Sequence, residues 1–391
     1  MTRPRALVLH NGKAAFDEAR APFAREIEFL DLHEAATAPA GAHEVPAFAP
    51  ERATLAVIDG LLARFPFRHV VTTSESNTAF AAFLRSRYGL AGPRYDQVLP
   101  ATSKWRMKQQ WGHAFPSARC WLPGDFRALA TQGRAPAEVV VKPLAGSSTK
   151  GVRRLGRQEC LDHLAATGEL VVVEEAIDLT SELHCDGVVR DGKPRVIVPS
   201  VYNRPPLGSA GHNLASIHLP VGDPRRGPAV EAACRVLAAI DVPDFVFHLE
   251  LLESHGTMRF GEIGFRPPGA GRAPSLLRFY GVDLWAEHIA AQLELPRPTR
   301  NGVTAPTGYC GVTGVAADPA GCHPSPPAET LRAIPGVVDV LPGSAHARSE
   351  AKLGSSVANT HLVLFSCDSE TGAHRVLQEI EAAGRSAPCS R

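Results

Sequence analysis

The feature that most constrains the fold is a pair of short β-rich segments, 245–252 and 258–265, each carrying a glutamate. The residues between them have a turn-like composition, so the pair predicts a β-hairpin. The hairpin would place Glu250 and Glu262 on neighbouring strands, with Arg266 four residues further on. Two carboxylates at that distance suit Mg²⁺, and an arginine beside them can form a forked contact with a phosphate or a carboxylate. The hairpin therefore predicts a nucleotide site.

Composition limits the class of protein. A chain of 391 residues with 44% hydrophobic and 21% charged residues is typical of a soluble globular protein with two to four subdomains. The 41 basic and 40 acidic residues give a net charge of +1, which provides no electrostatic footprint for nucleic acid or an acidic membrane.

Targeting signals and cysteine spacing bear on the compartment. No apolar run reaches the roughly eighteen residues of a membrane span, and the first apolar run is too short for a signal peptide. The eight cysteines lie at least twelve residues apart, so no CxxC pair exists. We expect reduced thiols and a cytoplasmic protein.

The first hundred residues alternate strand and helix signals, which predicts a parallel sheet. The expected strands are 6–9, 27–32 and 69–73. A helix should begin at Ser76 or Asn77 and end near residue 88. The Ala/Pro-rich segment 39–50 indicates a surface loop.

Beyond residue 100 we expect a basic helix at 103–111 and later helices at 228–240, 275–280 and 283–292. Further strands are expected at 138–142, 170–174, 183–189 and 196–200. The irregular segment 200–220 is typical of a functional loop. After residue 300 the sequence predicts a separate small β-rich module that ends in a helix at 370–383.

A small, flexible loop follows the strand 138–142 and contains Ser147, Ser148 and Gly151. Its backbone N–H groups could surround phosphates, and Lys142 could pair with phosphate oxygens. The loop is not a P-loop, because a valine follows Gly151 where that motif requires lysine. A surface turn with solvated serines is the alternative.

Two further segments could contact a nucleotide. Lys104, at the start of the basic helix, is either a phosphate contact or part of a solvated helix face. The strand end Glu174-Glu175-Ala176-Ile177 could offer backbone groups and an apolar side chain to an adenine, with Glu182 on the ribose. A strand end with solvated acids is the alternative.

Other polar residues indicate less. His248 favours packing or support, and for His184 and Asp186 we favour a surface strand face over a metal pair. No G-x-S-x-G or H-E-x-x-H motif occurs, and the glycines at 269–271 do not form a dinucleotide fingerprint. A polar set could recognise an amino acid or belong to a surface loop: Tyr202, Asn203, Arg204, His212 and Asn213.

The order of these parts along the chain resembles the ATP-grasp superfamily, in its carboxylate–amine ligase branch. The resemblance implies an α/β (α+β) fold with a parallel pre-ATP-grasp domain at 1–100. It implies an ATP-grasp central lid subdomain at 101–178 and a catalytic subdomain with the metal site at 179–300. The module at 301–391 resembles the C-terminal domain of L-amino-acid ligases that make dipeptides.

The resemblance also implies roles for single residues. Phosphates would be held by Lys104 and Lys142, beneath a loop formed by Ser147, Ser148 and Gly151. Adenine and ribose would contact Glu174, Glu175, Ala176, Ile177 and Glu182. Mg²⁺, or alternatively Mn²⁺, would be held by Glu250 and Glu262, and Arg266 would steady an acyl phosphate.

One position departs from the family pattern. Many members have Glu-x-Asn-x-Arg here, with the Asn as a further metal ligand, whereas this chain has Gly264. Metal binding could be weaker, or a water could fill the position. The run from Arg266 to Gly269 resembles a variant found among such ligases, so the change does not imply loss of activity.

The implied function is ATP-dependent amide or peptide bond formation between an amino-acid-like carboxylate and an amine, through an acyl phosphate. The alternatives are a phosphotransferase acting on a small molecule and a nucleotide-binding module without turnover. The expected partners are amino acids or peptides, without nucleic acid or membrane, and a homodimer is left open.

Overall fold

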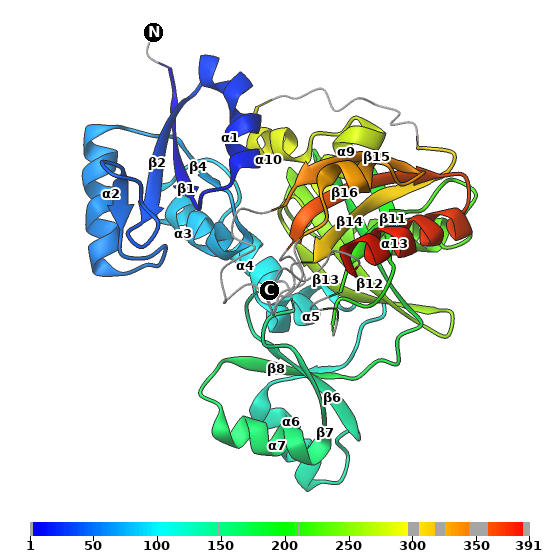
Figure 1. Cartoon of the computed structure of the whole chain (residues 1–391). Helices are drawn as coiled ribbons and strands as arrows, with labels where there is room; N and C mark the ends of the chain where they lie inside the picture. The colour runs from blue at the N-terminus through cyan, green and yellow to red at the C-terminus, as the bar shows by residue number, and fades with distance from the viewer. Residues whose placement is uncertain are drawn as a thin grey trace, which may run out of the picture.

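The computed structural model describes residues 3–146, 149–207, 209, 212–295, 305–316, 325–343 and 359–385. In these ranges the strands form three sheets, two of four strands and one of eight. Figure 1 shows the two smaller sheets as separate lobes beside the large one. The mixed α/β fold class expected from the sequence is confirmed.

The N-terminal lobe is a parallel sheet of order β3-β2-β1-β4, as the alternating pattern predicts. Its strands are β1 (Arg5–His10), β2 (Glu28–Glu34), β3 (His43–Val45) and β4 (His69–Thr72). Its helices are α1 (Ala14–Arg20), α2 (Arg52–Arg64) and α3 (Thr78–Tyr88). Strand β3 lies in the segment expected to be a loop, which is a correction. Its three residues, two of them exposed, are too few to show an alternating pattern.

The second small sheet is antiparallel, with the order β5-β8-β6-β7. It comprises β5 (Cys120–Trp121), β6 (Glu138–Pro143), β7 (Arg153–Gly156) and β8 (Val171–Glu175). Helices α6 (Pro123–Thr131) and α7 (Arg157–Ala166) cover it and contribute Phe126 and Leu164 to its own core. The lobe therefore has a separate core, and it projects from the rest of the molecule (Figure 1).

The large sheet has the order β13-β12-β9-β10-β11-β14-β16-β15. Its first strands are β9 (Ser181–Arg190), β10 (Lys193–Tyr202), β11 (Ala215–His218), β12 (Phe245–Ser254) and β13 (Thr257–Gly264). The last three are β14 (Tyr309–Ala316), β15 (Val337–Pro342) and β16 (Asn359–Cys367). The expectation of a separate C-terminal module is wrong, because β14 pairs with β11 and so extends the sheet. Without β14 one edge of β11 would be unpaired, and such an edge readily accepts another strand.

The remaining helices surround the large sheet and its junction with the two lobes. They are α4 (Tyr95–Thr102), α5 (Lys104–Trp111), α8 (Arg226–Ala238), α9 (Arg272–Tyr280), α10 (Leu284–Gln292), α11 (Ala328–Arg332) and α13 (Glu370–Arg385). Met107 and Trp111 of α5 lie in the core of the large sheet, together with Phe260 of β13. Helix α5 therefore packs against the large sheet. The domain boundaries at residues 100, 178 and 300 stay predictions.

The hairpin predicted from the sequence is confirmed as β12 and β13, which pair antiparallel. Its turn has His255 at φ 47° and Gly256 at φ 78°, the left-handed conformations that a tight two-residue hairpin turn requires. The pairing shifts by one residue between Leu249 and Leu251, so Glu250 faces a bulge in β13. Bulges of this kind often redirect side chains beside functional sites.

Gly187 in β9 shows how tightly the large sheet is built. A Cβ at this position would lie 1.9 Å from the carbonyl oxygen of Val196 and 2.8 Å from Cζ of Phe247. We expect Gly187→Ala to lower the free energy of unfolding by about 3 kcal/mol, as overpacking does in tight cores. The matched control is Gly227→Ala in α8, where a Cβ would meet nothing within 4 Å. This substitution should raise the free energy of unfolding by roughly 0.5–1 kcal/mol. Denaturant titration of both variants tests this, and equal stabilities would contradict it.

Two bulk features complete the description. No helix in the described ranges has the length and apolar character of a membrane-crossing segment. The cysteines that the structure describes are free thiols, at positions 120, 160, 185, 234, 310 and 367. This agrees with the expected reduced thiols for that part of the chain.

Candidate active site

A small pocket lies where the two lobes meet the large sheet. Its lining combines a residue that follows β4, the loop after β6, helices α4 and α5, and the hairpin. The lining residues are Glu75, Ala101, Thr102, Lys104, Met107, Gly146, His248, Glu262, Ile263, Gly264 and Arg266. The structure therefore brings together several residues that the sequence analysis selected far apart in the chain.

Lys104 links the glycine loop to the hairpin. Ser103 caps helix α5 through its side chain, and Lys104 is the first residue of that helix. Its Nζ lies 2.9 Å from the carbonyl oxygen of Gly146 and 2.9 Å from Oε2 of Glu262. Burial works to lower the pKa of Lys104, but the Glu262 carboxylate outweighs it and raises the pKa. Lys104 is therefore a partly buried cation between the loop and a carboxylate, not part of a solvated helix face.

Lys142 is held by a buried partner. Its Nζ lies 2.8 Å from Oε2 of Glu174 on the neighbouring strand β8, and Glu174 is only 3% exposed. Burial lowers the pKa of Lys142, but the carboxylates of Glu174 and Glu262 outweigh it and raise the pKa. Burial likewise raises the pKa of Glu174, whereas the charges of Lys142 and Lys108 bring it below its usual range. Both groups are therefore charged at neutral pH, and Lys142 keeps a fixed position.

Lys108 is a residue that the sequence analysis missed. It is buried, and its Nζ donates to the carbonyl oxygens of Phe260, at 2.9 Å, and Gly261, at 2.6 Å. These carbonyls directly precede Glu262 in β13. Lys108 therefore fixes the strand that presents Glu262. The only sequence signal was its position four residues after Lys104, which places both on one side of helix α5.

Three carboxylates gather beside the lysines. Burial raises the pKa of Glu250, but the hydrogen bond and charge of His248 outweigh it and hold the pKa at about 2. Burial and the charge of Glu250 raise the pKa of Glu182 well above its usual range. The charge of Glu262 also raises the pKa of Glu182. Carboxylate oxygens are the donors that Mg²⁺ prefers, so Glu250 and Glu262 are the candidates to hold a divalent cation.

Arg266 has a partner that local sequence reasoning could not find. Its Nε donates to Oε2 of Glu75, which lies 191 residues earlier in the short 3₁₀ helix Glu75–Asn77. A Cβ on Gly264 would lie 3.5–3.6 Å from the Glu75 carboxylate. The glutamate therefore occupies the space beside Gly264 and neutralises Arg266.

The segment 174–177, which was expected to contact adenine, already uses several of its polar groups in contacts within the protein. Glu174 points inward to Lys142, whereas Glu175 forms two 3.0 Å hydrogen bonds with Arg119 at the surface. The N–H groups of Glu175 and Ala176 already donate to the carbonyls of Arg119 and Glu138. The half-buried Ile177 remains the candidate for an adenine contact.

The glycine loop is described only in part. Ser147 and Ser148 lie outside the described residues. Gly151 has φ 70°, and a Cβ there would lie 2.9 Å from Cγ of Pro143. A left-handed backbone beside a strand end requires glycine at this position.

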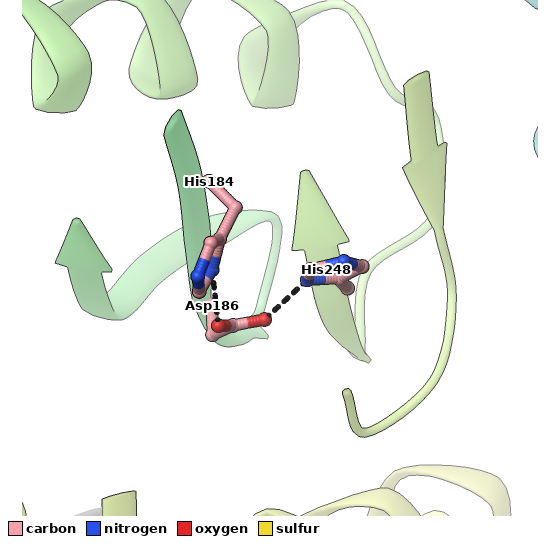
Figure 2. A group of neighbouring side chains, drawn as sticks. All are labelled: His184, Asp186 and His248. Carbon is pink, nitrogen blue, oxygen red and sulfur yellow. Dashed lines mark hydrogen bonds and ion pairs between the residues drawn. The ribbon is translucent and has the colours of Figure 1, made fainter. Parts of the chain in front are cut away.

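The expectation that His184 and Asp186 lie on a surface strand face is wrong. Both side chains are fully buried, because β9 has neighbouring strands on both edges and packed elements on both faces. Figure 2 shows Asp186 between His184 and His248, with one carboxylate oxygen directed to each ring.

The polar set expected to bind an amino acid is largely engaged within the protein. The side chain of Asn203 accepts a hydrogen bond from the N–H of Ala215 at 2.8 Å. Arg204 lies 3.3 Å from Glu381 of α13, and Tyr202 is buried against the ring of His184. These contacts favour the alternative interpretation, in which the residues anchor a loop.

Comparison with known proteins adds to this geometry. No family model matches the chain. Over 264 residues the chain is 28% identical to an L-arginine-specific L-amino acid ligase of Bacillus subtilis. The matched region covers 62% of this chain and 62% of that protein. The crystal structure of an L-amino acid ligase from Bacillus licheniformis superposes with a TM-score of 0.77, at 17% identity and over 98% of both chains. The chain has the ATP-grasp fold.

A second ATP-grasp structure agrees. The N5-carboxyaminoimidazole ribonucleotide synthetase of Thermus thermophilus superposes with a TM-score of 0.69, at 18% identity and over 98% of this chain and 99% of that one. The predicted resemblance to ATP-grasp carboxylate–amine ligases is thus confirmed at the level of the fold. The chain spans 62% of the length of the curated relative that it matches.

Proposed function

We propose that this ATP-grasp protein is an ADP-forming ligase that joins an amino-acid-like carboxylate to an amine. The observation that carries the proposal is the position of Lys104, which contacts both the glycine loop at Gly146 and the carboxylate of Glu262. Lys104, a cation suited to phosphate, Glu262, a carboxylate suited to a metal, and Arg266 thus line one pocket. The similarity to L-amino acid ligases supports the same reaction class.

The chemistry follows from this arrangement. A carboxylate oxygen attacks the γ-phosphorus of ATP, the bond from that phosphorus to the oxygen of ADP breaks, and an acyl phosphate forms. Lys104 and Lys142 neutralise charge on the transferring group, because positioning and electrostatics dominate phosphoryl transfer. Mg²⁺, held by Glu250 and Glu262, supplies further charge neutralisation when bound.

The second step is amide formation. The amine nitrogen attacks the acyl carbon, the carbon–oxygen bond to phosphate breaks, and the amine loses a proton. Arg266 stabilises the oxyanion that develops on the acyl oxygen. The lobe built on the sheet β5-β8-β6-β7, which we call the small lobe, carries the glycine loop and acts as a cover that protects the acyl phosphate from water.

The ion pair of Arg266 and Glu75 fits a zwitterionic substrate. A free amino acid carries a carboxylate that can pair with Arg266 and an ammonium group that can pair with Glu75. Its binding would replace the single ion pair between Arg266 and Glu75 with two ion pairs to the substrate. We expect Glu75→Gln to raise KM for the amino acid by roughly 10–100-fold, the value of a hydrogen bond to a charged group, with KM for ATP unchanged.

Steady-state kinetics on each substrate in turn measures the effect of Glu75→Gln. The control is Glu169→Gln, at an exposed residue of the small lobe, which should leave both constants unchanged. An equal rise in KM for ATP would show that Glu75 supports the fold of the pocket and does not select the substrate.

The acyl phosphate itself can be tested with isotopes. When the acid substrate carries ¹⁸O in its carboxylate, the proposed reaction transfers one ¹⁸O atom into inorganic phosphate. A phosphotransferase would instead produce a stable phosphorylated product and no labelled phosphate. Mass spectrometry of the released phosphate separates the two functions, and unlabelled phosphate alongside an amide product would rule out the acyl phosphate.

A further inference from the structure

A continuous chain of buried polar contacts leads from the candidate metal site into the large sheet. Nε2 of His248 lies 3.3 Å from Oε1 of Glu250, and Nδ1 of the same ring lies 2.7 Å from Oδ1 of Asp186. Oδ2 of Asp186 lies 2.7 Å from Nδ1 of His184, whose Nε2 lies 2.8 Å from Oγ of Ser216. The chain thus connects Glu250, a proposed metal ligand, to strand β11.

The register of the sheet produces this chain. His248 of β12 is directly opposite Asp186 of β9, and Glu250 is directly opposite His184. Directly opposed residues in an antiparallel pair have adjacent side chains, so two consecutive pairs on one face bring all four groups together. Figure 2 shows Asp186 between the two rings, with its carboxylate oxygens divided between them.

Burying Asp186 requires compensation. Its side chain is 0% exposed, and a buried carboxylate is costly unless it is paired and hydrogen-bonded. Burial raises the pKa of Asp186, but the two histidines outweigh it and bring the pKa far below its usual range. Burial lowers the pKa of His248, but Asp186 and Glu250 outweigh it and raise the pKa. Asp186 and His248 therefore favour each other's charged form, whereas burial lowers the pKa of His184.

We propose that Asp186 and His248 are positioning residues: Asp186 fixes the ring of His248, and His248 fixes the carboxylate of Glu250 in the orientation that binds the metal–nucleotide complex. This inference rests on the proposed function for the role of Glu250. The hydrogen bond that Nδ1 of His248 donates to Asp186 directs Nε2 of the same ring at the Glu250 oxygen. Partners of this kind behind a metal-binding carboxylate typically matter 10–100-fold for metal affinity.

A second buried histidine in the same sheet provides a comparison. Nδ1 and Nε2 of His218 each lie 2.8 Å from a serine hydroxyl, those of Ser200 and Ser275. This group is as buried as the first but contains no carboxylate, and these contacts do not reach Glu250. A histidine needs only hydroxyl partners to be accommodated in this core, so the carboxylate beside His248 has a different role.

The same three side chains could also be considered as ligands of a buried ion, since their donor atoms lie within 4.8 Å of one another. Asp186 accepts a hydrogen bond from Nδ1 of His248 at 2.7 Å, whereas its 2.7 Å contact with Nδ1 of His184 is an ion-pair contact in which neither atom has a hydrogen-bond partner among the described residues. Two ligands on one ion with bonds of about 2.1 Å would lie roughly 3 Å or more apart. Both separations in this cluster are shorter than that, so the distances favour direct contact between the side chains over a shared ion.

The test measures binding and not only turnover. Mn²⁺ binding in the presence of ADP is followed by electron paramagnetic resonance, and ADP binding without metal by calorimetry. We expect Asp186→Asn to weaken Mn²⁺ binding by about 10–100-fold with little change in metal-free ADP binding. The matched control is His218→Gln, which changes an equally buried histidine and should leave both quantities unchanged.

Each outcome decides the proposal. Wild-type Mn²⁺ binding by Asp186→Asn, or an equal loss in His218→Gln, would overturn it. A stoichiometric transition metal in the purified protein that Asp186→Asn removes would make the cluster a metal centre and would also overturn it. If Asp186→Asn does not fold, His248→Gln carries the same test. If wild-type protein binds Mn²⁺ and forms no amide while Asp186→Asn weakens Mn²⁺ binding, the ligase function fails and the positioning role stands.

Discussion

Replacing Glu262 with glutamine is expected to reduce ADP formation by about a thousandfold, the scale of losing a preorganised electrostatic contact at a reacting centre. The glutamate contributes in two ways: it is one of two proposed metal ligands, and it pairs with Nζ of Lys104 at 2.9 Å. A glutamine retains the size and one oxygen but removes the charge, so both the cation and Lys104 lose their partner.

The rate of ADP formation at saturating ATP and Mg²⁺ measures this effect. The control is Glu253→Gln on the same hairpin, where the side chain accepts a hydrogen bond from Ser181 away from the pocket lining. We expect normal turnover from the control. Near-normal turnover in Glu262→Gln would mean that the metal lies elsewhere.

Replacing Lys142 with methionine is expected to have two separable effects. ADP formation should fall by about a hundredfold or more, because a fixed cation for the transferred phosphate is lost. Stability should also fall, by about 3–5 kcal/mol, because the buried carboxylate of Glu174 is left without its main partner.

A double variant separates these two effects. In Lys142→Met/Glu174→Gln the buried charge is removed together with its partner, so most of the lost stability should return while ADP formation stays low. Denaturant titration and ADP release on the single and double variants provide the comparison. Recovery of activity in the double variant would show that Lys142 is needed for folding and not for phosphate.

The hairpin and the order of the parts were predictable because each depends on local patterns. The alternation in 245–252 and 258–265 and the turn between them specify the hairpin, and therefore the closeness of Glu250 and Glu262. The strand period also contained information that was not used. Glu174 and Glu175 are adjacent in a strand, so their side chains must face opposite sides, and only Glu174 could serve the interior.

Contacts between distant segments could not be predicted from one sequence. Glu75 and Arg266 are 191 residues apart, and nothing near either one indicates the other. The buried position of Asp186 was missed for a related reason. The alternation of apolar and polar residues over 183–186 in β9 is typical of a half-exposed strand, whereas the strand is buried on both faces and its polar side chains contact one another inside. The continuation of the large sheet by β14 likewise depends on a pairing that spans the chain.

The central claim is tested most directly by measuring ADP release over pairs of amino acids with the product amide quantified in parallel. The proposed function predicts ADP release that requires both an acid and an amine, with one amide formed for each ADP. ADP release at the same rate without any amine, across a broad panel of amino acids, would contradict it.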